Sequence, residues 1–410
     1  MIAAVGCALV AVFGGGSAVG AGATVDLYSS LPLQGASKAQ TGALVKGIEL
    51  ALKKANYKAG PLTIKYTSLD DSTAQAGNWD PAQTTQNARK VAQDPNAVGY
   101  IGEFNSGASE VSIPILNQAG VPQVSPANTY VGLTTSEPGT LKGEPGKYYP
   151  TGKRTYLRIV PRDTIQGLAL ARLMKSDGCK AVAVANDKEA YGAGLARVVI
   201  LDAKKLSLKV LNAGSAGAGD GIDKTAANYR SLASKYQSAG ADCFFFGGVT
   251  ANGAIQLYKD INAAMPTAKL YGGDGVCESG FTNPKQKGVT PAVDKKFQCT
   301  IATLNLNSYP GGKNFLAAFK KAYNDPHPDP YAIYGYEAGS LFVATLTKLG
   351  LKATGKDGKA NVLKALFATK NRHSVLGVYS FDKNGDTTLT DYGAYKVVGG
   401  LPTYAKAIRK

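Results

Sequence analysis

Residues 98–130 read VGYIGEFNSGASEVSIPILNQAGVPQVSPANTY, and this stretch decides the fold class. A short apolar run from Val98 to Ile101 predicts a buried strand that stops at Gly102. Apolar residues then recur at helical spacing over residues 111–116, and a second apolar run begins at Val121. Strand, helix and strand in so few residues indicate a parallel β-α-β unit, and therefore an α/β protein.

Two turns rich in hydroxyl groups and small residues follow the two strands, at residues 105–107 and 125–129. Open parallel sheets bind ligands at the carboxyl ends of their strands, where helix N-termini leave backbone N–H groups unpaired. Because neither turn carries a basic side chain, the pair favours a small carboxylate held by N–H and O–H donors. Taken singly, each turn has a simpler interpretation, with Ser106 as a helix N-cap and Ser125-Pro126 as an ordinary turn.

From about Val25 to its C-terminus, the two turns included, the chain resembles a known family. The resemblance rests on the order and spacing of several segments: LYSSLPLQG (27–35), GIELALKKAN (47–56), GEFNSGAS (102–109), VPQVSPANT (121–129), NDKEAYGAGLA (186–196), LYGGDGV (270–276) and YAIYGYEA (331–338). The family is that of the solute-binding proteins of branched-chain amino acid ABC importers, which are leucine/isoleucine/valine-binding-like proteins of the type I periplasmic binding protein class.

That resemblance implies two doubly wound parallel-sheet lobes joined by a hinge that the chain crosses three times, with the ligand in the cleft between them. We place the lobe boundaries by the same resemblance. The N-terminal lobe is expected to comprise residues 24–157 and 301–374, and the C-terminal lobe residues 158–300 and 375–410. Two domains also suit the length of 410 residues, which is too great for one ordinary core.

The family resemblance further implies which residues bind the two charged ends of an amino acid. The α-carboxylate would be held by the backbone N–H of Ser106, by the backbone of Ala127, and by the hydroxyl and N–H of Thr129. The α-ammonium would be held by Asp274 in the loop after the last parallel strand of the C-terminal lobe. Some relatives have glutamate there, and the shorter aspartate leaves room for a water.

Aromatic residues are implied around the rest of the ligand. Tyr191 matches a residue that closes over it from the C-terminal lobe, while Phe104 and Tyr331 match side-chain pocket positions. Gln40 and Val249 depart from the family, which often has tyrosine at both places. One rim of the ligand pocket is therefore more polar, and another rim is more open. Leucine, a polar amino acid, an amide, a urea-like solute and a small aromatic acid all remain as alternative ligands.

The N-terminus reads as a secretory signal. Residues 2–13 are apolar but too short to span a bilayer, and small residues follow up to Ala23. We expect a signal peptide over residues 1–23 and an extracytoplasmic protein, in the periplasm or at the cell surface. Cys7 is an alternative lipid-anchor site, although the chain continues apolar after it rather than as a polar tether.

Charge and composition bear on the partners. Lys and Arg outnumber Asp and Glu by 46 to 29, yet they occur as scattered pairs without a basic cluster or an RNA-binding aromatic motif. We therefore expect a dispersed basic surface and no nucleic-acid partner. The resemblance implies a monomer that delivers its amino acid, or related carboxylate, to an ABC permease in the membrane. A ligand sensor for a signalling receptor is the alternative.

A search for catalytic motifs does not favour an enzyme. The chain has two histidines, His327 and His373, and no C-x-x-C, H-E-x-x-H, G-x-S-x-G or strand-borne G-x-G-x-x-G pattern. A phosphate-loop-like segment at residues 350–356 lacks the following Ser or Thr, and it follows a helix instead of a strand. We expect a binding protein with no catalytic residues, no cofactor and no bound metal.

Four cysteines remain after removal of the signal, an even number in an oxidising compartment. Cys179 and Cys243 each begin a predicted parallel strand and can be neighbours across the sheet, while Cys277 and Cys299 would close a short loop. We predict these two disulfides, with buried free thiols as the alternative. Trp79, the only tryptophan, lies in a polar loop and is expected to pack on its own lobe, with shielding of the cleft as the alternative.

Overall fold

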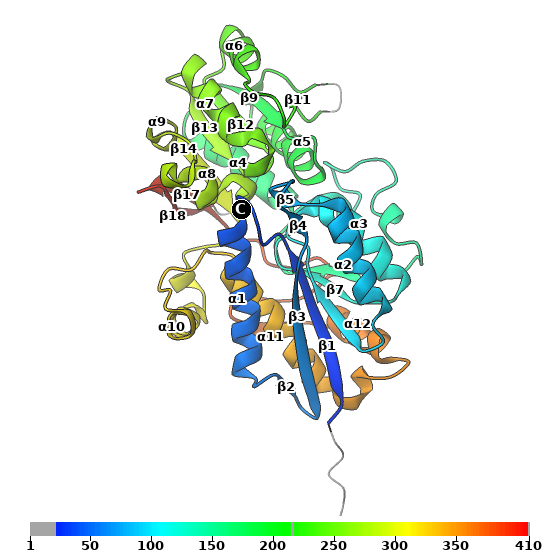
Figure 1. The fold of residues 1–410 in the computed structure, drawn as a ribbon. Helices are drawn as coiled ribbons and strands as arrows, with labels where there is room; N and C mark the ends of the chain where they lie inside the picture. The colour runs from blue at the N-terminus through cyan, green and yellow to red at the C-terminus, as the bar shows by residue number, and fades with distance from the viewer. Residues whose placement is uncertain (1–21, 215–216, 409–410) are drawn as a thin grey trace, which may run out of the picture.

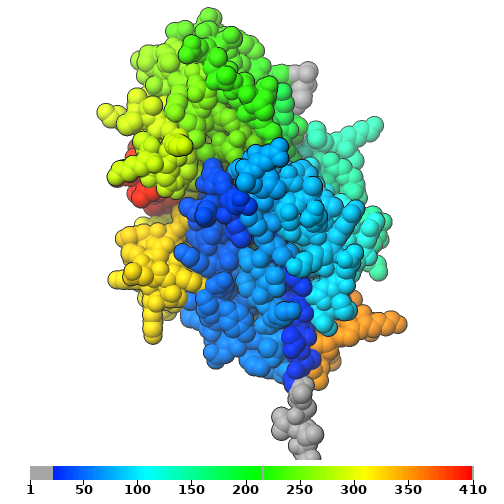
Figure 2. Space-filling model, viewed as in Figure 1, coloured from blue at the N-terminus to red at the C-terminus, as the bar shows by residue number. Residues whose placement is uncertain are grey.

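The computed structural model describes residues 22–214 and 217–408. It contains two large sheets, each covered by helices on both faces, stacked one above the other in Figure 1. We call the six-stranded sheet with its helices the N-terminal lobe, and the eight-stranded sheet with its helices the C-terminal lobe. The space-filling view shows the two lobes in contact, with a waist between them (Figure 2). In the part of the chain described, none of the helices has the length and hydropathy needed to cross a membrane.

The sheet of the N-terminal lobe has the order β2-β3-β1-β6-β7-β8, and all its pairs except β2 with β3 are parallel. The central strands are buried throughout because helices cover both faces, as their continuous apolar runs predict. The strands are β1 (Thr24–Leu31), β2 (Lys58–Ala59), β3 (Leu62–Asp70), β6 (Ala97–Ile101), β7 (Gln123–Ser125) and β8 (Tyr156–Arg158). A small hairpin, β4 (Ser72–Thr73) with β5 (Asn78–Trp79), follows β3.

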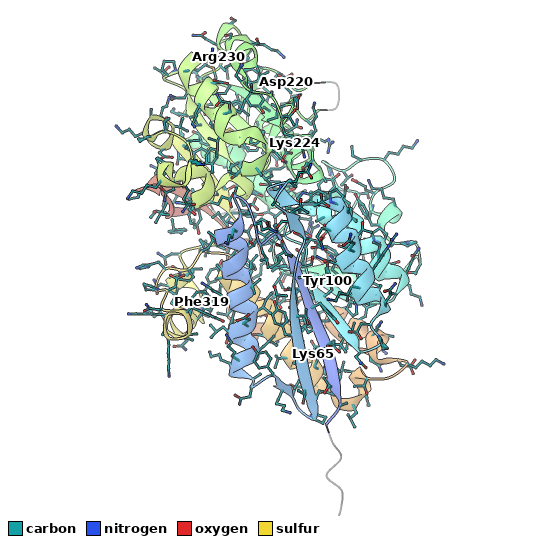
Figure 3. All side chains as sticks on the ribbon, in the orientation of Figure 1. Lys65, Tyr100, Asp220, Lys224, Arg230 and Phe319 are labelled. Atoms are coloured by element: carbon teal, nitrogen blue, oxygen red, sulfur yellow. A yellow bond between two sulfur atoms is a disulfide. The ribbon has the colours of Figure 1, made fainter. Side chains whose placement is uncertain are left out.

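Helices α1 (Lys38–Lys54) and α11 (Ala332–Leu349) pack closely on one face of this sheet. Their contact needs glycine, since a Cβ on Gly47 would lie 2.1 Å from the carbonyl oxygen of Ala332. Helix α12 (Gly358–Phe367) joins the same core, and α10 (Gly312–Tyr323) packs beside α1, with Phe319 labelled in Figure 3. Helices α2 (Pro81–Gln93) and α3 (Ser106–Gln118) cover the other face, around Tyr100.

The sheet of the C-terminal lobe has the order β10-β9-β12-β13-β14-β17-β18, with β11 beside β9. Its pairs are parallel up to β14, and β17 and β18 extend it antiparallel. The strands are β9 (Ala181–Asn186), β10 (Lys209–Val210), β11 (Asp220–Gly221), β12 (Cys243–Gly247), β13 (Lys269–Gly272), β14 (Phe297–Ile301), β17 (Tyr392–Val398) and β18 (Leu401–Ile408).

Helices α4 (Asp163–Ser176) and α5 (Ala190–Lys205) pack on one face of this sheet. Helices α6 (Arg230–Ser238) and α7 (Ile255–Ala264) cover the other face, and two short helices, α8 (Ser279–Thr282) and α9 (Pro291–Asp294), lie in the connections between β13 and β14. These observations confirm the predicted α/β class.

The chain passes from the N-terminal sheet to the C-terminal sheet after β8, returns after β14, and passes over again before β17. The boundaries given above remain predictions, and for the third crossing we propose a later position, between Asp386 and Tyr392. The hairpin of β15 (Arg372–Ser374) and β16 (Gly377–Tyr379) bonds to Glu337 of α11. Asp386 in turn pairs with the buried Arg158 of β8 at 2.6 Å.

Both cysteine pairs are bonded in the structure, Cys179 to Cys243 and Cys277 to Cys299, with Cα–Cα distances of 5.9 and 5.6 Å. The first bridge joins the chain just before β9 to the start of β12, two strands that pair directly. The second joins the turn after β13 to β14, which also pair. Because the second bridge begins three residues after Asp274, it ties the loop that carries the predicted acid to the sheet.

Candidate functional site

The two turns that follow β6 and β7 lie against each other. The Asn128 side chain donates to the Phe104 carbonyl at 2.7 Å, and the N–H of Tyr130 donates to Ser106 Oγ at 3.4 Å. Ser125 shapes its own turn, since its Oγ accepts from two backbone N–H groups and donates to the Glu103 carbonyl. The turn interpretation of Ser125 therefore holds, whereas Ser106 is the first residue of α3 and not its N-cap.

The first residues of α3, Ser106 and Gly107, line the space between the lobes. Asn105 occupies the N-cap position without capping the helix through its side chain. The first N–H groups of a helix have no partner within it, and they carry the positive end of the helix dipole. An anion at this place would therefore meet donors and a favourable field, as the sequence pattern predicts for a carboxylate.

A pair of buried carboxyl groups lies behind these turns. Tyr100 donates to Glu103 Oε1 at 2.6 Å, and both Asp71 and Glu103 are completely buried. Burial raises the pKa of Asp71, and the neighbouring Glu103 raises it further. Burial also raises the pKa of Glu103. Two such groups retain a proton more readily than two exposed acids, which limits the negative charge behind the two turns.

Asp274 projects from the turn after β13 and is 8% exposed. Its Oδ1 accepts from Gln166 Nε2 at 2.7 Å and from the Tyr191 hydroxyl at 2.8 Å, while its Oδ2 accepts from the Tyr331 hydroxyl at 2.9 Å. Burial raises the pKa of Asp274, although these three bonds act in the opposite direction. Because each carboxylate oxygen has two acceptor positions, Oδ2 has room for one further donor such as an ammonium group.

The turns and the acid enclose one cavity between the lobes. It is lined by Phe104, Asn105, Ser106, Gly107, Ala127, Thr129, Glu189, Tyr191, Val249, Asp274 and Gly275. Its volume is about 20 Å³, enough for about one water molecule. The lobes must therefore move apart to admit a larger solute. Asn105 Oδ1 is buried there without a hydrogen-bond partner among the described residues, and the Thr129 hydroxyl lies beside the Asp163 carboxyl group of α4.

Six of the eight predicted ligand residues line this cavity: Phe104, Ser106, Ala127, Thr129, Tyr191 and Asp274. Tyr331 lies directly behind it, bonded to Asp274 and in edge contact with the Phe104 ring at 5.9 Å between centroids. Gln40 is buried on α1 but is not part of the lining. The structure thus brings these residues together, and their roles toward a ligand stay predictions.

Sequence reasoning missed two polar groups beside the acid, Gln166 and Asp163, both on α4 and both fully buried. Burial raises the pKa of Asp163 to about 8, and the nearby Asp274 charge adds to the rise. Gln166 shares a helical stripe with Leu170 and Leu173, which are also buried. A polar residue on an apolar stripe was a usable signal, because such a group needs a partner when it is buried.

Trp79, at the end of β5, connects the lobes at the mouth of the cavity. Its indole N–H donates to Glu189 Oε2 at 3.1 Å, and the other oxygen of Glu189 pairs with Lys224 at 3.3 Å. A Cβ on Gly107 would lie 2.6 Å from the indole ring, so Trp79 covers the start of α3. The expectation that it packs on its own lobe is met only in part, because the ring also bonds across the cleft. Figure 3 shows Lys224 on the side of the C-terminal lobe nearest to the N-terminal lobe.

Comparison with known proteins agrees with this architecture. The periplasmic binding protein family matches residues 29–400. The chain is 27% identical over 397 residues to "Leu/Ile/Val-binding protein homolog 1" of Brucella melitensis biotype 1, covering 95% of this chain and 94% of the relative. It is 23% identical to an "Amino acid binding protein" of Pseudomonas aeruginosa, covering 81% and 79%.

Solved structures share the fold at lower identity. A leucine-binding protein, LivK, from Thermotoga maritima superimposes with a TM-score of 0.75 at 19% identity, covering 94% of this chain and 98% of that one. An ABC transporter solute-binding protein of R. palustris in complex with benzoate superimposes with a TM-score of 0.73 at 20% identity, covering 94% and 96%. The predicted type I architecture and family resemblance are thereby confirmed, and the chain belongs to the periplasmic binding protein family.

Proposed function

We propose that this protein captures an α-amino acid outside the cytoplasm and delivers it to an ABC importer. One observation carries the proposal: a buried carboxylate of one lobe, Asp274, lies across one small cavity from the start of helix α3 and the Thr129 hydroxyl of the other lobe. The turns offer donors to an α-carboxylate, and Asp274 offers an acceptor to an α-ammonium group.

The relatives support the same solute class. The curated proteins of similar length are named for binding leucine, isoleucine and valine, and solved structures of the same fold hold leucine, isoleucine or benzoate. Benzoate lacks an ammonium group, so it would bring a second carboxylate to the cavity and no cationic partner for the acid at position 274. That cost favours an amino acid over an aromatic acid in this chain.

The remaining features of the proposal follow from the family. A solute-binding protein works outside the cytoplasm with a permease, and we expect a monomer that neither catalyses a reaction nor binds nucleic acid. The signal peptide over residues 1–23 lies almost wholly outside the described residues, and Cys7, the alternative lipid-anchor site, lies wholly outside them. A ligand sensor for a signalling receptor would close in the same way. The neighbouring genes distinguish the two roles, since permease and ATPase genes indicate transport and a kinase gene indicates sensing.

A thermal-shift screen across amino acids and small aromatic acids tests the proposal directly, because a ligand stabilises only the state that binds it. We expect at least one α-amino acid to raise the midpoint of unfolding, and its decarboxylated and deaminated analogues to have no effect. Stabilisation by benzoates alone, or by no amino acid at all, would refute it. Small-angle scattering of the same complex should show a smaller radius of gyration than the free protein.

A further inference from the structure

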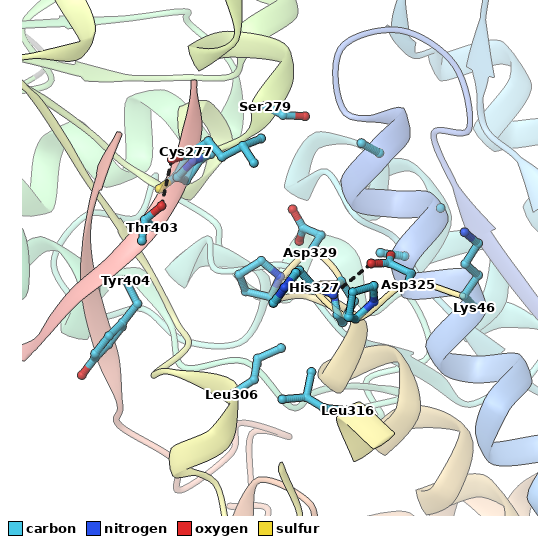
Figure 4. A pocket seen from close by; sticks show the side chains of 18 of the residues that line it. Lys46, Cys277, Ser279, Leu306, Leu316, Asp325, His327, Asp329, Thr403 and Tyr404 are labelled. Atoms are coloured by element: carbon cyan, nitrogen blue, oxygen red, sulfur yellow. Dashed lines mark hydrogen bonds between the residues drawn. The ribbon is translucent and has the colours of Figure 1, made fainter. Parts of the chain in front are cut away.

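A large groove opens between the two lobes, apart from the enclosed cavity. Its volume is about 1520 Å³, and it lies between the start of α1, the loop 325–330 and strand β18 (Figure 4). Lys38, Lys46 and Lys320 line its outer part. The Cys277–Ser279 loop and Asp329 line its inner end, where the Asp329 carboxylate points into the groove on the side of that loop.

Two acids from opposite lobes meet between this groove and the enclosed cavity. Glu278 lies between the groove-lining Cys277 and Ser279, is 2% exposed, and accepts weakly from the Ser37 hydroxyl of the other lobe at 3.4 Å. It also lies beside Thr250, which donates to the carbonyl of the cavity-lining Gly275 at 3.3 Å. Asp329 accepts from the N–H of Tyr331, whose hydroxyl reaches Asp274.

This pair lacks a counter-ion. Neither carboxylate forms an ion pair with any residue of the described chain. Their hydrogen-bond partners are neutral: the hydroxyls of Ser37 and Thr250 for Glu278, and the Tyr331 N–H and the Gln40 side chain for Asp329. Burial raises the pKa of Glu278 to about 7, and the nearby Asp329 adds to the rise. Burial also raises the pKa of Asp329 to about 7, with Gln40 beside it.

We propose that Glu278 and Asp329 bind the positively charged end of the ligand's side chain, so that the captured solute is a cationic α-amino acid. The inference rests on the proposed function, in which Asp274 and the two turns hold the α-groups. Val249 and Gly275 line the cavity, and Thr250 bonds both to the Gly275 carbonyl and to Glu278, so Glu278 lies behind this wall of the cavity. Two neighbouring acids without a counter-ion, Glu278 buried and Asp329 half-buried at the groove, are stabilised when a cation joins them.

The alternative role of Glu278 is lobe closure alone, through Ser37 and the positive end of the α1 dipole. That contact does not account for Asp329, whose carboxylate points into the groove (Figure 4) and is held by the Tyr331 N–H and the Gln40 side chain. The two roles predict different specificity. A closing contact acts on every ligand equally, whereas a cation site acts only on ligands that carry the cation.

Isothermal titration calorimetry with L-lysine and L-norleucine tests the proposal, because the two share a four-carbon side chain and differ in the terminal ammonium. We expect the wild-type protein at pH 8 to bind lysine more than about 10-fold tighter than norleucine. In E278Q and in D329N, the affinity for lysine should fall by about 30-fold or more. The affinity for norleucine should change by less than about 3-fold in both variants. D294N is the matched control, because Asp294 of α9 is a partly buried acid with an unpartnered oxygen outside both cavities.

The pH dependence gives an independent readout. Only the ionised acids attract a cation, so the preference for lysine over norleucine should grow from pH 6 to pH 8 in the wild type and not in E278Q. Asp274 and Asp163 lie near the α-groups of both ligands and cancel in this ratio. Lys38, Lys46, Lys320, Asp325 and His327 line the same groove, with His327 beside Asp329 (Figure 4), and the E278Q comparison leaves all of them unchanged.

Two results would overturn the inference while leaving the proposed function intact. These are norleucine binding as tightly as lysine in the wild type, and an E278Q variant that weakens both ligands equally. Binding of neither amino acid, together with no response to any other α-amino acid, would instead overturn the proposed function, and the inference with it. If E278Q does not fold, the wild-type comparison and D329N still decide.

Discussion

The two faces of the cleft use opposite chemistry. The N-terminal lobe contributes the donors, from the turns after β6 and β7 and the start of α3, with a proton-retaining carboxyl pair behind them. The C-terminal lobe contributes the acceptor, Asp274, together with the α4 groups Gln166 and Asp163. A zwitterion complements both faces at once, whereas a ligand with one charged end complements only one. A ligand favours closure only if contacts with both lobes give it a higher affinity for the closed state than for the open state.

Removing the acceptor should have the largest effect. Asp274→Ala leaves the ligand's ammonium buried and unpaired, which costs roughly 2 to 5 kcal/mol, or about 30-fold to several thousand-fold in affinity. Asp274→Asn keeps an acceptor but loses the charge. Its affinity for the ligand should therefore lie between those of the wild type and Asp274→Ala. Calorimetry with the best amino acid from the thermal screen measures all three, and circular dichroism checks that each variant is folded.

Removing one donor should cost less. Thr129→Ala deletes one hydroxyl, but the ligand's carboxylate keeps its backbone N–H partners, so we expect a loss of about 1 to 3 kcal/mol, or about 5- to 150-fold. Thr135→Ala is the control, because Thr135 is a buried threonine of the same loop whose hydroxyl bonds to the Val131 carbonyl, away from the cavity.

The order of these two effects separates the ligand classes. For an amino acid, the Asp274 variant is the weaker binder of the two. For a plain carboxylate the order reverses, because Asp274 repels the acid and its loss leaves affinity unchanged or improved. A neutral Asp274→Ala would therefore end the amino acid proposal even though the family assignment stands.

The smallest effect is expected at the mouth of the cleft. Trp79→Phe keeps the ring over Gly107 but removes the bond to Glu189, a loss of about 0.5 to 1.5 kcal/mol, or roughly 2- to 10-fold. It should appear mainly as faster ligand release, measured by surface plasmon resonance. Lys224→Ala, which removes an exposed partner of the same Glu189, should change the release rate less. Equal effects would mean that Trp79 does not hold the lobes together.

The comparison between the faces also separates what the sequence could predict from what it could not. The turns of the N-terminal lobe follow from local pattern, since two apolar runs flank an amphipathic segment and parallel strands end at the same edge of a sheet. The disulfides follow from similar reasoning, because Cys179 and Cys243 each precede or begin an apolar strand and such strands tend to pair. These features depend on residues close in sequence or on repeating elements.

Local sequence pattern did not predict the role or the surroundings of Asp274 in the C-terminal lobe. Asp274 was placed by family resemblance, and nothing near it in sequence predicts that its carboxylate accepts from Gln166, Tyr191 and Tyr331, which come from three different helices or their ends. Its environment depends on how α4, α5 and α11 pack around the cleft. Gln40 shows the converse, since the resemblance placed it at the rim while the structure buries it beside Asp329 instead.

By itself, then, the sequence determined the α/β class, the family, the two hydroxyl-rich turns and the cysteine pairs, because each is encoded in local spacing or in an ordered set of motifs. Tertiary structure alone decided the bond from Trp79 to Glu189, the carboxyl pair Asp71–Glu103 and the approach of Glu278 to Asp329. The physical reason is the same in all three cases. Burial and the meeting of side chains far apart in the chain depend on how complete layers pack, and no short window of residues contains that information.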